Sequence, residues 1–310
     1  MSLVNFFLTA VTVALVCHPA GAVQSQNEVG LGHTSNANLS STDERSDTFY
    51  RLSTTNVWPN ADGRFRLRVA FEDYFEEHYN DFLSWNASQL WKTLSAFRGW
   101  SLVGSVFGRH YTHDSPGFTD ESFSHIGVNA KAEHRDKLQR GMTLVWGPSL
   151  EFRQYIQTSN RVDNTAFANA MIEFEPRNNW ELDVFFNVGA LLSSRSEFSR
   201  LMAEAGGGAT YSVNKTWDWS NELLIRRSHF LNREVSTDTV TTRSRGQGGR
   251  VRTVSTRETY TTVALSTQLN RELNASWRAG CELNWINQSS ESGYQNYSAA
   301  ELYGRLTWIF

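Results

Sequence analysis

The sequence predicts an all-β fold, a transmembrane, antiparallel, up-and-down β-barrel of about twelve strands, within a range of about ten to fourteen. Two observations predict this class. From residue 63 to the end, apolar and polar residues alternate with a period of two, so each strand has one apolar and one polar face. Between these stretches, short and long connections alternate, as they do where strands run up and down a barrel.

The apolar stripes, which we expect to face lipid, define a barrel domain over residues 63–310. In order they cover residues 65–71, 83–91, 100–106, 126–132, 142–152, 166–174, 180–192, 201–213, 217–225, 263–269, 273–285 and the closing strand. The short connections lie near residues 95–98, 136–138, 176–179, 214–215 and 270–272. The longer ones lie at residues 76–80, 112–120, 157–163, 193–198, 233–254 and 288–295.

The closing strand is apolar on one face up to the last residue. Its apolar residues are Leu302, Gly304, Leu306, Trp308 and Phe310. An apolar edge strand invites aggregation in water, whereas a closed barrel in lipid gives it two neighbours and a suitable solvent. The strand resembles the closing strand of bacterial outer-membrane β-barrels. That resemblance implies that Phe310, Trp308 and Leu306 form the signal read by the barrel assembly machinery, which would be a partner.

Outer-membrane barrels keep their short turns in the periplasm. We therefore expect both ends of the chain to be periplasmic, since Phe310 lies on the short-turn side. Six tryptophans lie within a few residues of a short turn or the terminus: Trp91, Trp100, Trp180, Trp217, Trp219 and Trp308. Indole rings prefer the headgroup level, so these side chains would form a periplasmic girdle in contact with outer-membrane lipids.

The amino-terminal end predicts export. Leu3 begins an apolar run that ends at Val16, and the small residues up to Ala22 suit signal peptidase, so residues 1–22 would be a signal peptide. No Lys or Arg precedes the run, which departs from the usual pattern. Cys17 could instead be the lipidated cysteine of a lipoprotein. The residue before such a cysteine is expected to be small, however, and Val16 is bulky. After Ala22 no run of 18 apolar residues occurs, so no transmembrane helix is expected.

The composition agrees with a barrel. The mean hydropathy of −0.45 fits strands in which only alternate residues are apolar, and 13% of the residues are aromatic, including 11 Trp. The net charge of −3 argues against a nucleic-acid partner, which calls for a basic surface. Residues 23–62 are rich in Ser, Thr, Asn and Asp and show little periodicity. They predict a polar periplasmic leader, or a partial plug in which residues 48–58 enter the lumen.

The polar faces of the strands would line the lumen with charges of both signs. The basic candidates are Arg64, Arg66, Arg68 and Arg305, which we expect to form one wall on the first and last strands of the predicted barrel. The acidic candidates are Glu173, Glu175, Glu181 and Asp183, which would face them, and Glu301 lies on the closing strand. Opposed walls would create a transverse field that favours polar or zwitterionic solutes. The same charges could instead pair with one another and block a narrow lumen.

By strand count and closing strand, the chain resembles the monomeric twelve-stranded outer-membrane channels that pass oligosaccharides or nucleosides. The resemblance implies passive diffusion of small polar solutes or oligosaccharides, without a catalytic residue, metal or cofactor. The alternative is a non-conducting structural or interaction barrel. Its loop at residues 233–254, with Arg243, Arg245, Arg250 and Arg252, could bind lipopolysaccharide phosphates or an anionic polymer.

A third alternative is an outer-membrane hydrolase. The candidate cluster contains His110, His113, Asp114 and His125, with Ser115 as the nearby hydroxyl. A histidine with a carboxylate suits general-base or metal chemistry. Their spacing is unspecific, however, and solvated loop histidines are the simpler reading.

Overall fold

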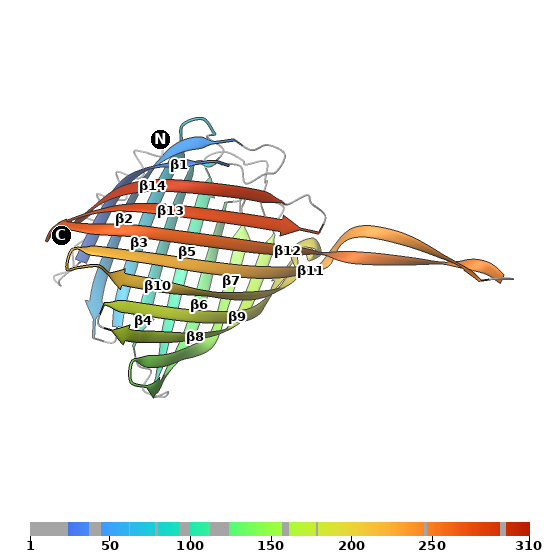
Figure 1. Ribbon diagram of the computed structural model, residues 1–310, viewed down its shortest axis with the longest axis horizontal. Coiled ribbons are helices and arrows are strands. Elements are labelled where there is room, and N and C mark those ends of the chain that lie inside the picture. The colour runs from blue at the N-terminus through green and yellow to red at the C-terminus, as the bar shows by residue number, and fades with distance from the viewer. Residues whose placement is uncertain are drawn as a thin grey trace.

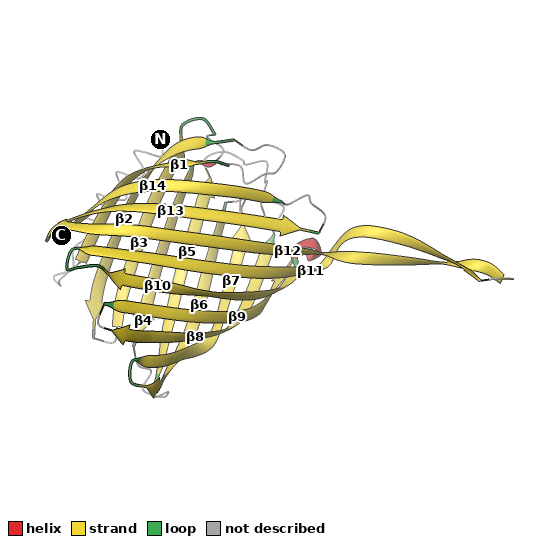
Figure 2. Cartoon of the chain, in the orientation of Figure 1, coloured by secondary structure: helices red, strands yellow, loops and turns green. Residues whose placement is uncertain are grey.

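In the computed structural model the chain forms a closed barrel of fourteen antiparallel strands, each paired with its neighbours in sequence, and the first strand pairs with the last (Figures 1 and 2). The structure describes residues 24–36, 45–61, 63–77, 80–92, 99–111, 124–156, 161–177, 179–244, 247–291 and 296–310, with only the backbone described at 234–256. The strands are β1 (Gln24–Thr34), β2 (Asp47–Asn60), β3 (Gly63–Tyr74), β4 (Phe82–Trp91), β5 (Trp100–Tyr111), β6 (His125–Gln139), β7 (Met142–Tyr155), β8 (Val162–Arg177), β9 (Trp180–Ser193), β10 (Arg200–Ser212), β11 (Trp217–Ser244), β12 (Gln247–Asn274), β13 (Trp277–Ser290) and β14 (Tyr297–Ile309).

The all-β, antiparallel barrel is confirmed, but it has fourteen strands and not about twelve. The two further strands, β1 and β2, come from the segment predicted to be a leader or plug, so that prediction is wrong for these residues. Residues 48–58 pair with β1 and β3 in the wall, where Thr48 lies opposite His33 and Trp58 opposite Phe65. The predicted signal peptide, residues 1–22, lies outside the described residues.

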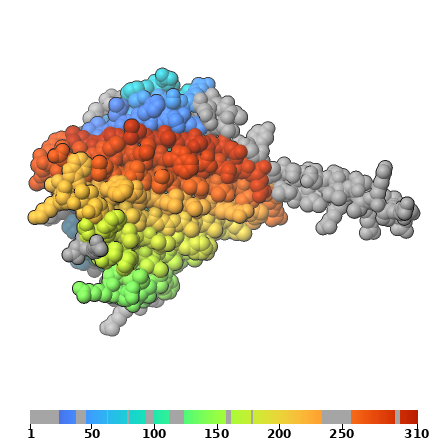
Figure 3. Space-filling view, in the orientation of Figure 1, coloured from blue at the N-terminus to red at the C-terminus, as the bar shows by residue number. Residues whose placement is uncertain are grey.

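The exterior of the wall is apolar, as the stripes predicted. Side chains such as Leu150, Val184 and Leu302 are exposed to 61%, 65% and 54%, and they belong to the stripes assigned to lipid. Figure 3 shows one side of this wall, where the side chains of β10–β14 lie next to one another. A continuous exposed apolar surface of this extent suits a hydrocarbon solvent rather than water.

On one side of the barrel, the connections are short where the structure describes them. Short turns join β2 to β3, β6 to β7, β8 to β9, β10 to β11 and β12 to β13, and Phe310 ends on the same side. Two of them lie beyond the predicted positions, at residues 140–141 and 275–276, because β6 and β12 continue further than their apolar stripes. Gly141 adopts a φ of +72° in the first of these turns. The connections predicted at residues 95–98 and 112–120 lie outside the described residues.

Aside from the strands, the described part of the chain contains the short 3₁₀ turn Ser196–Phe198. Among the described residues, no helix is long and apolar enough to cross a membrane.

Backbone hydrogen bonds at the chain's last residue complete the closure. The Ser25 amide donates to the Phe310 carbonyl and the Phe310 amide donates to the Ser25 carbonyl, both at 3.0 Å. On the outer face, the Trp308 ring lies 4.7 Å from that of Phe310 and stacks at 6.0 Å on Trp277. The predicted facing of β14 is confirmed, because Leu302 is exposed outside and Tyr303 is fully buried inside.

Two glycines of β1 make room for aromatic rings inside the barrel. A Cβ at Gly30 would collide with the Tyr303 ring, and one at Gly32 with the Phe49 ring. We expect Gly30→Val to lower the free energy of unfolding by about 2 kcal/mol, since overpacking forces such rings off their rotamers. Denaturant titration of the refolded barrel measures this. Gly304→Ala is the matched control, because its Cβ would meet only the Leu31 carbonyl at 3.9 Å. Equal effects of both substitutions would contradict the prediction.

Candidate functional site

The candidate site is the barrel interior, which contains cavities whose linings include charged and polar side chains. Four of them have volumes of about 550, 420, 410 and 300 Å³. The 550 Å³ and 300 Å³ cavities share Asn129, Glu151 and Arg153, so they adjoin. The 550 Å³ and 420 Å³ cavities adjoin along β3, where Arg68 lines the first and Arg66 the second.

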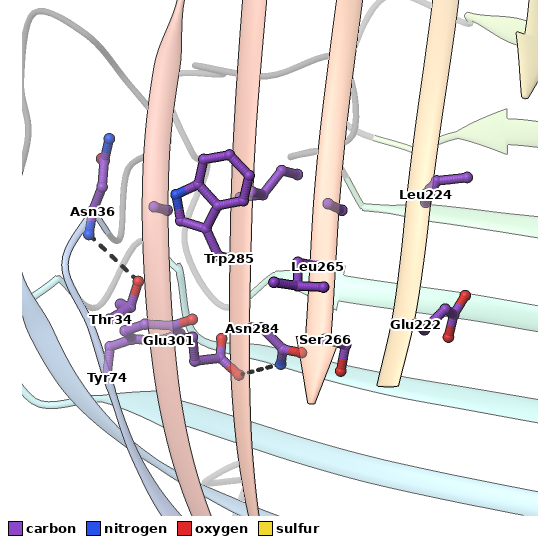
Figure 4. A pocket seen from close by; sticks show the side chains of 13 residues that line it. Thr34, Asn36, Tyr74, Glu222, Leu224, Leu265, Ser266, Asn284, Trp285 and Glu301 are labelled. Atoms are coloured by element: carbon purple, nitrogen blue, oxygen red, sulfur yellow. Dashed lines mark hydrogen bonds between the residues drawn. The ribbon is translucent and has the colours of Figure 1, made fainter. Parts of the chain in front are cut away.

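The 410 Å³ cavity lies against β11–β14, and its largely apolar lining includes two carboxylates (Figure 4). Glu222 and Glu301 contribute carboxylates, with Ser266 and Asn284 between them. The Asn284 amide donates to Glu282 at 2.8 Å and, at 3.5 Å, to Glu301. This cavity therefore presents negative charge and amide groups to whatever occupies the lumen.

A tight ion pair joins β2 to β3 beside this cavity. Arg51 and Glu72 lie opposite one another in the register, and the guanidinium contacts the Glu72 carboxylate at 2.6 Å. The Tyr74 hydroxyl donates to the other Glu72 oxygen at 2.9 Å. Arg51 also lies 4.7 Å over the Tyr303 ring, which stacks on Phe49 at 6.1 Å. The sequence reading missed this cluster because Arg51 lay in the predicted leader.

On the opposite arc, the 300 Å³ cavity is lined by four arginines and three carboxylates, so its lining carries a net positive charge. They are Arg153, Arg161, Arg200, Arg226, Glu151, Asp163 and Glu204. Three ion pairs form among them: Arg153–Glu151 at 2.8 Å, Arg161–Asp163 at 2.5 Å and Arg226–Glu204 at 2.6 Å.

Arg161 is the most enclosed of these arginines. Its side chain is 2% exposed, and its guanidinium carbon lies 3.7 Å from the centre of the Phe198 ring and 4.4 Å from that of Tyr155. The sequence analysis assigned Arg161 and Asp163 to a loop and did not select them. The sequence feature that could have identified them is the Arg-x-Asp spacing at the start of β8. This spacing places both side chains on one face of an extended segment.

Three of the four arginines predicted to form a basic wall lie on one strand. Arg64, Arg66 and Arg68 lie on β3 with exposed side chains, and no ion pair to them is seen within the described part of the chain. Lys92 and Arg135 add positive charge to the same 420 Å³ cavity, and Glu133 adds negative charge.

Arg305 does not belong to this wall, so that part of the prediction is wrong. Strands β1 and β2 separate β14 from β3, and Arg305 instead contacts Glu282 at 3.0 Å and Asn270 at 2.9 Å. Glu301, on the same strand, lies 3.9 Å from Arg51 and belongs to the cluster on β2 and β3.

The predicted acidic wall lies across the barrel from the β3 arginines. Around the ring of fourteen strands, β8 is five positions and β9 six positions from β3. Glu175 and Glu181 are exposed and Asp183 is half-buried. Glu173 forms a two-bond contact with Arg135 on β6, at 2.8 and 3.1 Å, which offsets its charge.

The segment predicted to be the longest loop is instead a paired ribbon. Strands β11 and β12 continue beyond the barrel as a two-stranded hairpin that projects from one end (Figure 1). Arg250 lies opposite Thr242 and Arg252 opposite Val240, so the two arginine positions share one face of the ribbon. Arg243 lies near its tip on β11. Arg245 lies outside the described residues.

The predicted hydrolase cluster is described only in part. The Ser124 hydroxyl lies 3.3 Å from His110 Nδ1 and accepts the Tyr111 amide at 2.9 Å, in a position with no exposed surface. This contact, which the sequence reading missed, caps the end of β5. The His125 ring packs between those of Phe107 and Tyr155. His113, Asp114 and Ser115 lie outside the described residues. Where the structure describes side chains, no group of three or more metal-binding residues is found.

No protein-family model matches the sequence, and no curated protein matches it. Solved structures of similar shape include the NanC porin, with 7% identity, a TM-score of 0.44 and coverage of 91% of this chain and 98% of that one. An outer membrane channel from Pseudomonas putida F1 has 14% identity, a TM-score of 0.43 and coverage of 95% and 97%. An anion-selective porin from Comamonas acidovorans has 8% identity, a TM-score of 0.46 and coverage of 93% and 99%.

These likenesses are too low to carry a solute or a residue role from those proteins to this chain. The chain is a closed, antiparallel, fourteen-stranded β-barrel, and the solved structures it is similar to are outer-membrane porins and channels.

Proposed function

We propose that this barrel is a bacterial outer-membrane channel for passive diffusion of small polar solutes or oligosaccharides. One observation carries the proposal: adjoining cavities with charged linings occupy the interior of a closed wall whose outer surface is apolar. Lipid can solvate the outer surface, and water and polar solutes can occupy the inner one. The chemistry is binding and screening by side chains, with no covalent step, metal or cofactor.

The lining favours polar over apolar solutes. Arg64, Arg66 and Arg68 stand on one side of the barrel, and Glu175 and Glu181 stand on the other, near the same short-turn end. A dipolar solute gains by aligning with the field between them, whereas an apolar solute must displace the water that solvates them without compensation.

The proposed orientation places the short turns and both chain ends in the periplasm. It rests on the five short turns at one end of the barrel, since bacterial barrels keep their short turns in the periplasm and their long loops outside. The exposed apolar stripes would then contact outer-membrane lipids, and the projecting β11–β12 ribbon would reach the cell exterior.

Single-channel conductance of refolded residues 23–310 in a planar bilayer tests the proposal. Folding is first checked by the heat-dependent shift of the folded band in gel electrophoresis. Steady conductance steps would support a channel, and solutes could then be screened by their block of the current. A folded barrel that gives no steps would contradict it.

A non-conducting structural or interaction barrel is the second candidate. The observation that favours it is the number of ion pairs that link neighbouring strands inside the wall, such as Arg51–Glu72, Arg226–Glu204 and Arg305–Glu282. If such pairs also spanned the lumen they would close it, and the conductance measurement separates these cases.

The ribbon is the proposed contact for lipopolysaccharide or another anionic polymer. The backbone register places the Arg250 and Arg252 positions on one face of the ribbon and Arg243 near its tip, and arginine is the residue type best suited to bind phosphate. We expect deletion of residues 234–256 to leave the unfolding midpoint unchanged, because β11 pairs with β10 only up to Phe230.

The same deletion is expected to weaken lipopolysaccharide binding by at least about tenfold, since even one charged hydrogen bond to phosphate contributes about 1.5 kcal/mol or more. Binding is measured by sedimentation with lipopolysaccharide aggregates at fixed salt. Substitution of Arg243, Arg250 and Arg252 by Lys is the charge-preserving control. Unchanged binding after deletion would contradict the assignment.

Phe310 is the proposed assembly signal for the barrel assembly machinery. Deleting it removes one residue and two closing hydrogen bonds, so refolding in detergent should be reduced only slightly. Insertion in cells should fall severely, because the machinery reads the terminal residue. Refolding and insertion are each measured as the fraction of protein that shows the heat-dependent gel shift. Refolded purified protein reports the first, and protein extracted from cell membranes reports the second. Equal losses in both would indicate a structural role alone.

A further inference from the structure

A cluster of four side chains on the outer face of the barrel is unlike the rest of the wall. Trp100, His134, Asp136 and Trp146 come from β5, β6 and β7, on the faces opposite the lumen-lining Ser101, Glu133 and Arg135. Trp100 is the first residue of β5, and Asp136 lies three residues before the end of β6. The cluster therefore lies near the short-turn end.

A carboxylate on a lipid-facing surface is costly unless it has partners and lies near the interface. Asp136 has both. One oxygen accepts a hydrogen bond from His134 Nε2 at 3.0 Å, and the other accepts one from Trp146 Nε1 at 2.9 Å. The side chain is still 46% exposed. Each carboxylate oxygen has two lone pairs, so acceptor sites remain for a ligand.

The imidazole orients the carboxylate. Its Nε2 contacts Asp136, and its Nδ1 is buried without a hydrogen-bond partner among the described residues. The outer surface at this point thus carries an oriented anion that is partly open.

Two indole rings complete the site. The rings of Trp100 and Trp146 are 5.1 Å apart at 76°, and the His134 ring lies 5.2 and 5.5 Å from them. Perpendicular indoles beside a carboxylate form a corner that attracts an organic ammonium through cation–π and ionic contacts. Inorganic divalent cations prefer a shell of oxygen ligands, which this corner does not supply.

We propose that Trp100, His134, Asp136 and Trp146 form a lipid site that binds the primary ammonium of an aminoethyl phospholipid headgroup. This rests on the proposed membrane location of the barrel. A primary ammonium can donate hydrogen bonds to Asp136, which a quaternary one cannot. The exposed Arg140, at the adjoining turn, supplies positive charge for the headgroup phosphate.

Other tryptophans on the outer face serve as an internal comparison. Trp277 and Trp308 stack with an angle of 14°, and Trp219 Nε1 donates to the Thr267 hydroxyl. In the described part of the chain neither arrangement includes a carboxylate. A general preference of indoles for headgroups would apply to all of them, whereas the proposed site requires Asp136.

The test is native mass spectrometry of the full refolded chain in detergent, with equimolar phosphatidylethanolamine, phosphatidylcholine and phosphatidylglycerol. We expect phosphatidylethanolamine to be retained preferentially. Asp136→Asn, which keeps the shape of the side chain, should lower its retention about fivefold, and Trp146→Phe should lower it also. Trp219→Phe should not change it.

Equal retention of the three lipids, or no change with Asp136→Asn in a barrel that still shows the heat shift, would overturn the proposal. Preferential retention of phosphatidylcholine would also overturn it, since the corner would then select a quaternary ammonium. Lipid retention is measured without current, so a barrel that binds the lipid but does not conduct would refute the channel and leave this site intact.

Discussion

Replacing Arg51 with methionine is expected to lower the free energy of unfolding by about 3 kcal/mol, because it leaves the Glu72 carboxylate buried without its cation. The Glu72 side chain is only 4% exposed, and its remaining described partner would be the Tyr74 hydroxyl. The replacement also removes the guanidinium from the Tyr303 ring. Denaturant titration of the refolded barrel in lipid vesicles measures the change.

Two further variants define the cause. The double variant Arg51→Met with Glu72→Met should recover most of the loss, since replacing both members of a buried pair is close to neutral. Arg278→Met is the matched control. Its pair with Glu272 is equally short, at 2.6 Å, but the side chains are 49% and 42% exposed, so less than about 1 kcal/mol should be lost. A double variant as unstable as Arg51→Met would show that packing, rather than the unpaired charge, causes the effect.

The barrel could be predicted wherever the exterior imposes a one-sided pattern. From β3 to β14 the outward residues are apolar often enough to reveal the strands, as Leu150, Val184 and Leu302 illustrate. In β1 and β2 the outward face includes polar residues such as Ser25 and Asn56, which hydrogen-bond to each other, so the exposed Val29 and Leu31 make only a short apolar stripe. Their strand structure comes from backbone pairing with β14 and β3, which alternation alone does not reveal.

The same reasoning explains the ribbon. The apolar stripes of β11 and β12 end near Ile225 and Val263, yet pairing continues almost to the tip of the hairpin. Beyond the lipid-facing zone, the apolar pattern is no longer required, and Thr-rich and Val-containing strands continue through their β propensity. A reading based on apolar stripes therefore stops where that zone ends.

For the lumen, the alternation of residues predicts which charges face inward but not which of them pair. Arg51–Glu72 and Glu204–Arg226 are direct register partners, and register depends on knowing every strand. The two undetected strands separate Arg305 from Arg64, and Arg305 instead contacts Glu282 on the other neighbouring strand, β13. Inward facing is a local property of the sequence, whereas pairing is a property of the closed ring.

Substituting Arg64, Arg66 and Arg68 together by alanine is expected to shift the anion-to-cation permeability ratio about fivefold toward cations. At about 10 Å from the path of an ion, a unit charge contributes about 0.4 kcal/mol in water, which salt reduces to about 0.15 kcal/mol. Three charges act with opposite sign on anions and cations, which gives a difference of about 1 kcal/mol. The reversal potential in a salt gradient across a planar bilayer measures the ratio.

The charge-preserving triple substitution by lysine should keep the wild-type ratio, and Glu175→Gln with Glu181→Gln should shift it toward anions. These carboxylates lie across the barrel near the same short-turn end. Opposite shifts from the two sides would identify a transverse field there, since a single ring of like charge would respond in one direction only. If neither substitution moves the reversal potential of a conducting barrel, selectivity is set further along the lumen, and Arg153 and Arg200, which line the 300 Å³ cavity, are the residues to substitute next.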